Sequence, residues 1–187
     1  MNKEVSYKNG FIIPVRGSRS YKRILRDARE GEIIKVRNGV YATPDTLAGG
    51  MIDIDTIVPG GIICLYSAWH HYGMTMQIPD SYYVAIRRKR RVSLPETIDI
   101  TLVYQKDELL DIGRTKAIID GIEVAIYDRE RCLCDAIKYR NKIGIGVMAE
   151  ILNSYLSYSK KNLSLLAQYA KQLRVYNLLS NYLDVKI

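Results

Sequence analysis

Two cysteines and two histidines are the side chains of this sequence best suited to bind a metal ion. They are Cys132, Cys134, His70 and His71. A structural zinc site usually pairs cysteines two to four residues apart and needs four converging ligands. On a helix, Cys132 and Cys134 would lie about 200° apart, so one ion cannot readily bind both thiolates. The pattern favours buried, inert thiols, and we expect no metal and no cofactor.

Four carboxylates suggest a second chemistry, the binding of a divalent ion for nucleic-acid cleavage. They are Asp120, Glu123, Asp128 and Glu130. Asp120 falls in an expected turn, and Glu123 would point out of a hairpin. Asp128 suits a helix N-cap, and Glu130 suits the first turn of that helix. Ser67 lacks the Gly-x-Ser-x-Gly elbow of a serine hydrolase. A metal-dependent nuclease is therefore the third of three hypotheses, and we expect a protein that is not an enzyme.

Charge is distributed unevenly along the 187 residues, which carry a net +8. Residues 1–50 contain ten Lys and Arg against five Asp and Glu, whereas residues 51–80 contain three Asp and neither Lys nor Arg. An uninterrupted basic run follows, made of Arg87, Arg88, Lys89, Arg90 and Arg91. Basic clusters favour nucleic acid or an acidic protein as partner, and a solvated surface is the alternative.

An amphipathic helix with a basic face is predicted between residues 18 and 31. Ser18 suits the N-cap and Gly31 the C-cap. At about 100° per residue, the basic residues fall within an arc of roughly 120°. They are Arg19, Lys22, Arg23, Arg26 and Arg29. Ile24 and Leu25 fall on the opposite, apolar side.

A tight hairpin is predicted next, because Asn38-Gly39 separates two strand-like runs, residues 32–37 and 40–42. This pair favours a type I′ turn, in which both central residues have a positive φ. A basic helix followed by such a hairpin is typical of the second half of a winged helix-turn-helix, whose helix enters the major groove. The alternative is a helix packed on a hairpin with its arginines in water. The predicted DNA-binding residues are Arg19, Lys22, Arg23, Arg26, Arg37 and Asn38, with residues 87–91 as a second basic patch.

Three segments of the chain resemble the antitoxins of bacterial type IV (AbiEi-like) toxin–antitoxin pairs. They are residues 37–44 (RNGVYATP), residues 57–75, and residues 127–136, where Glu130 and Asp135 have the spacing of the family motif. The likeness covers residues 18–180. It implies an abortive-infection, phage-defence antitoxin that represses its own promoter. It also implies a neighbouring nucleotidyltransferase-like toxin, opposed without a stable complex between the two proteins.

The chain departs from this family at its N-terminus. Members usually have two helices ahead of the recognition helix, and about seventeen residues precede it here. Residues 7–13 read as a turn and a strand, while Pro14 and Gly17 block a helix. The winged helix is therefore truncated. A homodimer or a partner chain could supply the missing helices. Alternatively, the chain is a protein-interaction module that no longer binds DNA.

The remaining patterns predict an α+β fold, or an α/β mixture. Strands are expected over residues 82–86 and 98–104, and a second two-residue hairpin over residues 117–126 around Asp120-Gly121. Helices are expected over residues 61–72, 129–142, 147–158, 162–173 and 175–184. The expected architecture is a partial winged helix in residues 1–50. A larger domain follows in residues 51–187, with a mostly antiparallel sheet and a helical C-terminal third.

Compartment is indicated by cysteine use and hydropathy. Three cysteines without a disulfide framework fit a reducing cytosol. No apolar run approaches the roughly 18–20 residues that span a bilayer, and the first residues lack the apolar core of a secretory signal. The prediction is a cytoplasmic protein without membrane contact.

Overall fold

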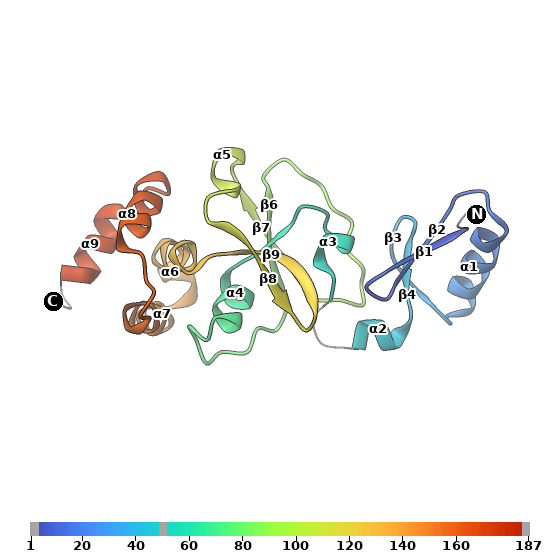
Figure 1. Cartoon of the computed structure of the whole chain (residues 1–187), viewed down its shortest axis with the longest axis horizontal. Coiled ribbons are helices and arrows are strands. Elements are labelled where there is room, and N and C mark those ends of the chain that lie inside the picture. The colour runs from blue at the N-terminus through green and yellow to red at the C-terminus, as the bar shows by residue number, and fades with distance from the viewer. Residues whose placement is uncertain (1–3, 49–51, 185–187) are drawn as a thin grey trace. The chain divides into compact units, whose positions relative to one another are not determined.

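The fold is an α+β mixture, as predicted, and it contains two sheets in a computed structural model that describes residues 4–48 and 52–184 (Figure 1). The chain forms two compact units. Unit 1 contains residues 1–61, 91–99 and 117–124, and unit 2 contains residues 62–90, 100–116 and 125–187. The expected boundary between residues 50 and 51 lies outside the described residues, so a division of the chain there stays a prediction.

Unit 1 contains a four-stranded antiparallel sheet. Its strands are β1 (Val5–Lys8), β2 (Phe11–Pro14), β3 (Ile34–Arg37) and β4 (Val40–Ala42), in the order β1-β2-β4-β3. Strand β1 was not expected. It forms because Asn9 and Gly10 take φ values of 47° and 83°, the two positive angles of a type I′ turn. The predicted turn and strand over residues 7–13 are therefore part of a full hairpin.

The predicted hairpin after helix α1 (Arg19–Glu30) is present, but its turn is not type I′. Gly39 has a φ of 76°, whereas Asn38 does not have a positive φ. The pairing of β3 with β4 shifts register between Lys35 and Arg37. An extra residue in one strand locally disrupts the hydrogen-bond ladder and changes the twist of the hairpin. The Asn-Gly motif alone does not predict such an irregularity.

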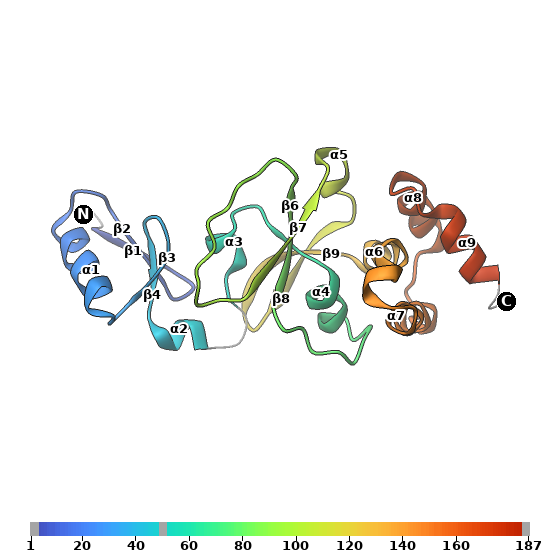
Figure 2. The ribbon, with the colours of Figure 1, turned by 180° about the vertical axis from the view of Figure 1, so that it is seen from behind.

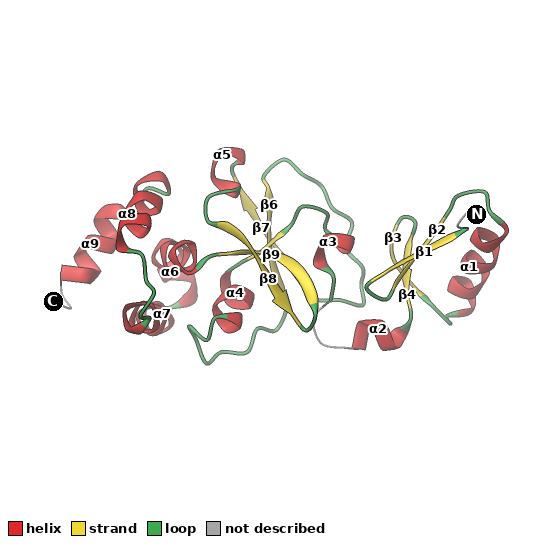
Figure 3. Ribbon diagram, viewed as in Figure 1, coloured by secondary structure: helices red, strands yellow, loops and turns green. Residues whose placement is uncertain are grey.

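The second sheet has five strands in the order β7-β6-β5-β9-β8. They are β5 (Ile62–Ile63), β6 (Tyr82–Arg87), β7 (Ile100–Gln105), β8 (Arg114–Ile119) and β9 (Ile122–Tyr127). The expectation of a mostly antiparallel sheet is wrong, because β5 runs parallel to β9 and β6 runs parallel to β7. Parallel neighbours need a connection of about a dozen residues. The loop of residues 88–99 is that long (Figure 3). Asp120 and Gly121 form the predicted two-residue turn between β8 and β9, and their φ values of 49° and 79° are those of type I′.

The predicted helix over residues 61–72 is wrong in its first four residues. Ile62 and Ile63 pair with β6 and β9 as strand β5, and helix α4 begins only at Leu65 (Leu65–His71). Two β-branched residues that are completely or almost completely buried suit the centre of a sheet. An apolar run of this length does not distinguish a buried strand from a buried helix.

The helical C-terminal third is as predicted. It consists of α6 (Arg129–Ile143), α7 (Ile145–Ser157), α8 (Leu163–Gln172) and α9 (Tyr176–Asp184), which follow one another in Figure 2. Asp128 caps α6, and Gly144 ends it with a φ of 90°. Helix α6 packs against α4, α7 and α8. The Trp69 indole is completely buried there and donates to the Cys132 carbonyl at 3.0 Å.

Three short helices were not predicted. They are α2 (Pro44–Ala48), α3 (Ile54–Ile57) and α5 (Asp107–Leu110). Each spans about one turn, too short for helical periodicity to be recognised in the sequence. Across residues 4–48 and 52–184, no helix combines the length and the hydrophobicity needed to cross a membrane.

Candidate nucleic-acid interface

The basic face predicted for α1 is formed and open to solvent. Ser18 has extended backbone angles and accepts a hydrogen bond from the Tyr21 N–H at 3.1 Å, and Gly31 closes the helix with a φ of 81°. Ile24 is the buried residue of the helix, which packs against β2. Five basic side chains are exposed: Arg19, Lys22, Arg23, Arg26 and Arg29. The structure thus brings four of the six predicted DNA-binding residues onto one helix.

Ion pairs along α1 are long and face solvent. Arg23 lies 3.7 Å from Asp27, and Arg26 lies 3.6 Å from Asp27 and 3.8 Å from Glu30. The two arginine side chains remain 78% and 66% exposed. Exposed pairs of this kind contribute roughly 0–1 kcal/mol, so a phosphate can compete for either arginine.

The two ends of α1 differ in their suitability for an anion. Carboxylate oxygens of Asp27, Glu30 and Glu32 lie within 4.8 Å of one another at the C-terminal end of the helix, where they repel phosphate. The N-terminal end carries Arg19, Lys22 and the positive end of the helix dipole, with the carboxylate of Glu4 beside it, which accepts from the Ser20 hydroxyl at 2.6 Å. The first two turns are therefore the part of the helix best suited to bind a phosphate backbone.

A hairpin precedes α1 where a winged helix-turn-helix would have two helices. Strands β1 and β2 pair with each other, and β2 also pairs with β4, so the order of elements is strand-strand-helix-strand-strand. Among the described residues no helix precedes α1, as Pro14 and Gly17 led us to expect. The helix is supported from one side by a sheet rather than by a helical pair.

The other two predicted DNA-binding residues lie on the β3–β4 hairpin. Asn38 is exposed in its turn. Arg37 is half-buried, and its Nε donates to the Thr56 carbonyl at 2.6 Å. That hydrogen bond orders the hairpin against α3, so Arg37 has a structural role that the sequence did not indicate.

The second predicted basic patch begins at the end of β6. Arg87, Arg88, Lys89 and Arg91 are exposed and Arg90 is half-buried. Arg87 lies 3.6 Å from Asp107. The backbone N–H of Arg90 donates to the Arg87 carbonyl at 3.0 Å, which closes a turn. The run is thus a solvent-facing turn that belongs partly to unit 2 and, at Arg91, to unit 1.

A buried carboxylate joins the first hairpin to α3, and sequence reasoning missed it. Asp53 is almost completely buried and accepts hydrogen bonds from Asn9 Nδ2 at 2.8 Å and Thr56 Oγ1 at 2.9 Å, with Lys8 Nζ at 3.2 Å. Burial alone would raise the pKa of Asp53, but these partners lower it below its usual value. The sequence predicted a turn at Asn9-Gly10 but gave no signal that Asp53, 44 residues away, would accept from Asn9.

The three cysteines are buried as free thiols, and His71, also considered as a metal ligand, lies near Arg129. Cys64, Cys132 and Cys134 are free and buried, and burial raises the pKa of each thiol, that of Cys134 to about 12. They are therefore protonated thiols at neutral pH, the poor nucleophiles and poor ligands expected of buried cysteines. Burial, with a smaller effect of Arg129, lowers the pKa of His71.

The four carboxylates considered for a nuclease site are divided between the two units. Asp120 and Glu123 belong to unit 1, and Asp128 and Glu130 to unit 2. Glu130 is buried and accepts hydrogen bonds from the Tyr155 hydroxyl and the Asn162 N–H, both at 3.0 Å. It connects the start of α6 to α7 and to the N-cap of α8, which is a packing role.

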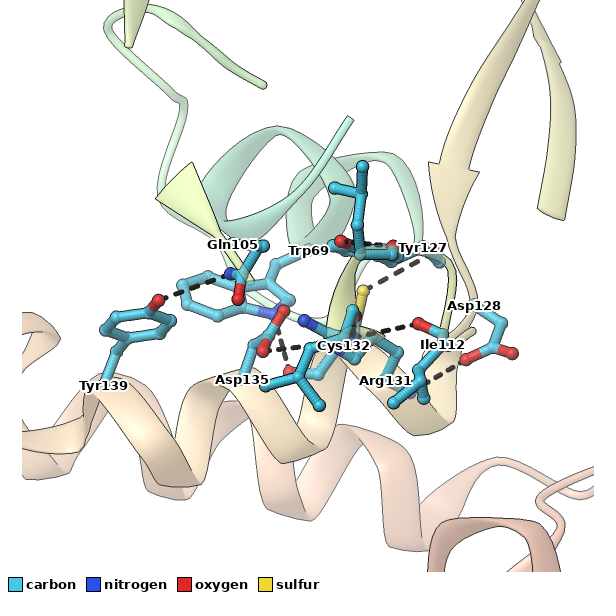
Figure 4. A network of polar contacts seen from close by, with 11 residues as sticks. Trp69, Gln105, Ile112, Tyr127, Asp128, Arg131, Cys132, Asp135 and Tyr139 are labelled. Atoms are coloured by element: carbon cyan, nitrogen blue, oxygen red, sulfur yellow. Dashed lines mark hydrogen bonds and ion pairs between the residues drawn. The ribbon is translucent and has the colours of Figure 1, made fainter. Parts of the chain in front are cut away.

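The centre of unit 2 contains a buried ion pair of α6 (Figure 4). Arg131 Nε lies 3.0 Å from Asp135 Oδ1, and both side chains are almost completely shielded from solvent. Arg131 Nη1 donates to the carbonyls of Leu109 and Ile112 at 2.8 and 3.0 Å, and the guanidinium lies 4.3 Å from the Tyr127 ring centroid. Burial alone would lower the pKa of Arg131, but Asp135 and its other neighbours raise it.

Asp128 is predicted to make stability depend on pH. Burial, partly offset by the Arg131 N–H, raises the pKa of Asp128 to about 6, while its Oδ2 accepts from the Tyr169 hydroxyl at 3.1 Å. A raised folded pKa means that this contribution is complete below pH 4 and is lost as pH rises through 6. We expect a loss of about 1–2 kcal/mol in unfolding free energy after solvent screening. Urea titrations from pH 4.5 to 7.5 measure it.

Asp128→Asn is the matched control, because asparagine is an equally good N-cap that does not titrate. Subtracting the pH profile of the variant from that of the parent isolates the Asp128 contribution from opposing ones such as Asp53. Identical pH profiles for the two proteins would contradict the assignment.

Comparison with known proteins gives no match, either among models of protein families or among curated proteins.

Proposed function

We propose that this protein is a DNA-binding autoregulator that binds phosphates through the basic face of α1. The observation that carries the proposal is the exposure of five cations on one face of a helix capped at both ends. Helices with this charge pattern bind the phosphate backbone by releasing counterions, a contribution that does not depend on sequence. Asn38, exposed in the adjacent hairpin, is the candidate for a contact with a base edge.

The proposed biological role is that of a cytoplasmic antitoxin of the type IV, AbiEi-like class. It is supported by the resemblance of residues 57–75 and 127–136, whose motif residues Glu130 and Asp135 have packing roles in unit 2. In this role the protein represses its own promoter and opposes a neighbouring nucleotidyltransferase-like toxin. A homodimer is the proposed DNA-binding form, because among the described residues no helix precedes α1 to support it as the helices of a winged helix-turn-helix would.

DNA binding is tested by titration against the region upstream of the protein's own gene, at several salt concentrations and with scrambled DNA as competitor. With four to six phosphate contacts, the logarithm of the binding constant should fall against the logarithm of salt with a slope of roughly −4 to −5. Arg23→Ala with Arg26→Ala should make the slope less steep by about two and weaken binding at low salt. Alanine preserves the helix.

The control replaces two exposed cations elsewhere, Lys160→Ala with Lys171→Ala, which removes the same charge from unit 2. If both double variants weaken binding equally, the effect is one of net charge and the α1 interface is contradicted. If the parent binds promoter and scrambled DNA equally, sequence-specific autoregulation is contradicted.

The antitoxin role is tested by co-expression with the adjacent gene product. The full chain is expected to restore growth, and Arg23→Ala with Arg26→Ala should retain this protection while losing repression of a promoter fusion. A chain that accumulates in soluble form but fails to restore growth contradicts the role. So does a neighbouring gene product that is not toxic.

A protein-interaction module that no longer binds DNA is the second candidate function. It is favoured by Met76 and Ile78, whose side chains are 89% and 82% exposed. Their loop is anchored to α7, because Glu150 accepts hydrogen bonds from Thr75 Oγ1 at 3.0 Å and from the Met76 N–H at 2.7 Å. Large apolar side chains on an ordered loop are suited to contact a protein. DNA binding that stays undetectable at every salt concentration would favour this candidate.

A further inference from the structure

A cleft of about 460 Å³ lies within unit 1, away from the side chains assigned above to α1. One wall consists of residues 34–38, which are β3 and the start of its turn, and the other wall consists of residues 93–97 of the long loop between β6 and β7. The volume is within the range of roughly 300–1,000 Å³ typical of ligand sites.

The cleft runs along the outer edge of β3. Side chains of a regular strand point alternately to opposite faces, so a cavity lined by all four residues of β3, together with Asn38 of the turn, follows the backbone edge rather than one face of the sheet. Strand β3 is the last strand of its sheet, and its paired edge faces β4. Among the described residues, no strand pairs with the other edge. The backbone N–H and C=O groups of that edge can therefore pair with an added strand.

The lining of the cleft is cationic and partly apolar. Lys35 is exposed and Arg37 is half-buried, whereas Glu96 is the acidic residue of the lining. Buried Pro95 and half-buried Leu94 provide apolar surface on the opposite wall. Arg37 is held in place by its hydrogen bond to Thr56, so this wall is ordered before any ligand arrives.

These features distinguish among three occupants. A second copy of β3 would place Lys35 and Arg37 of both copies against each other, and like charges across paired strands are destabilising. A nucleic-acid strand would find no aromatic side chain to stack on among the ten lining residues, and its phosphates would meet Glu96. An extended peptide that carries carboxylates matches both the strand edge and the two cations.

We propose that this cleft is a docking site for an extended acidic peptide segment of a partner protein, which adds to the sheet as a strand beside β3. The main-chain groups of β3 supply affinity, and Lys35 and Arg37 select carboxylates on the side of the peptide that faces them. The site uses none of the α1 cations, and it shares Arg37 and Asn38 with the predicted DNA-binding residues.

The test uses the full-length protein and a fluorescein-labelled eight-residue peptide of alternating glutamate and valine, followed by fluorescence anisotropy. Lys35→Glu should weaken binding roughly five- to tenfold, and Glu96→Gln should strengthen it about twofold. Lys22→Glu, the same charge reversal on α1, is the matched control and should leave the affinity within about twofold of the parent. A lysine–valine peptide should not bind.

Strand addition also predicts a result that electrostatics alone would not produce. Bound peptide should slow hydrogen exchange at outward-facing amides of β3, and a peptide with proline at alternate positions, which lacks those donors, should not bind. The proposal is overturned if the glutamate–valine peptide does not bind at millimolar concentration or if β3 exchange is unchanged. It is also overturned if an eight-nucleotide oligothymidylate binds as tightly.

Discussion

Asp135→Leu is expected to destabilise the protein by about 3–5 kcal/mol, because it leaves the Arg131 guanidinium buried without its counterion. Arg131 is completely shielded from solvent, and its Nη2 has no hydrogen-bond partner among the described residues even in the parent. The carbonyls of Leu109 and Ile112 would remain as its acceptors. Chemical denaturation followed by circular dichroism measures the loss.

Two further variants separate the charge from the packing. Asp135→Asn keeps an acceptor oxygen of the same shape and is expected to lose about half as much stability as Asp135→Leu. The double variant Arg131→Met with Asp135→Leu removes both charges, so it should be more stable than Asp135→Leu alone. Arg131→Met by itself completes the set. If the double variant loses as much unfolding free energy as Asp135→Leu and Arg131→Met lose in sum, the two residues are not coupled.

Gly113→Ala is expected to destabilise the protein by about 2–4 kcal/mol, through a steric clash combined with backbone strain. Gly113 has a φ of 75°, and an alanine Cβ would collide with Cβ of Arg131 and lie 3.0 Å from Asp128 Oδ1. Neither neighbour can move freely. Arg131 is held in its buried ion pair with Asp135. Asp128 is the N-cap of α6, and its N–H donates to the Gly113 carbonyl at 2.7 Å.

Gly121→Ala is the matched control for this prediction. Gly121 has a similar φ of 79°, but an added Cβ would meet no atom within 4 Å. It should therefore show the backbone strain alone, about 1 kcal/mol. Equal losses of unfolding free energy for the two variants would mean that the clash with Arg131 contributes nothing. The relevant measurement is urea unfolding of both variants under the same conditions.

Local signals in the sequence predicted local structure well. Ser18 and Gly31 were predicted as the caps of α1, Asp128 as the cap of α6, and Asp120-Gly121 as a two-residue hairpin turn, and the structure confirms each. Capping and tight turns depend on residues within a few positions of one another, so their energetics are contained in short stretches of sequence. The basic face of α1 follows for the same reason, because helical periodicity places the side chains.

Strand direction was not recoverable in this way. The parallel pairings of β5 with β9 and of β6 with β7 join segments far apart in the chain, and alternation of polar and apolar residues does not encode direction. Ile62 and Ile63 became strand β5 because they lie between β6 and β9, a tertiary effect that outweighs a locally helical pattern.

The buried polar contacts were also decided by tertiary structure alone. Asp53 is separated by more than 40 residues from Asn9, its hydrogen-bond partner, and Arg37 by 19 residues from Thr56. Even Arg131 and Asp135, four positions apart on a helix, could have been a surface pair. The packing of unit 2 buries Arg131 and Asp135 almost completely, and so makes them an internal ion pair. The sequence by itself determined the caps, turns and charged faces of this protein, because these depend on neighbouring residues. Its tertiary structure determined which charges are buried and which remain available to bind a partner, because burial and long-range contact depend on how distant segments pack.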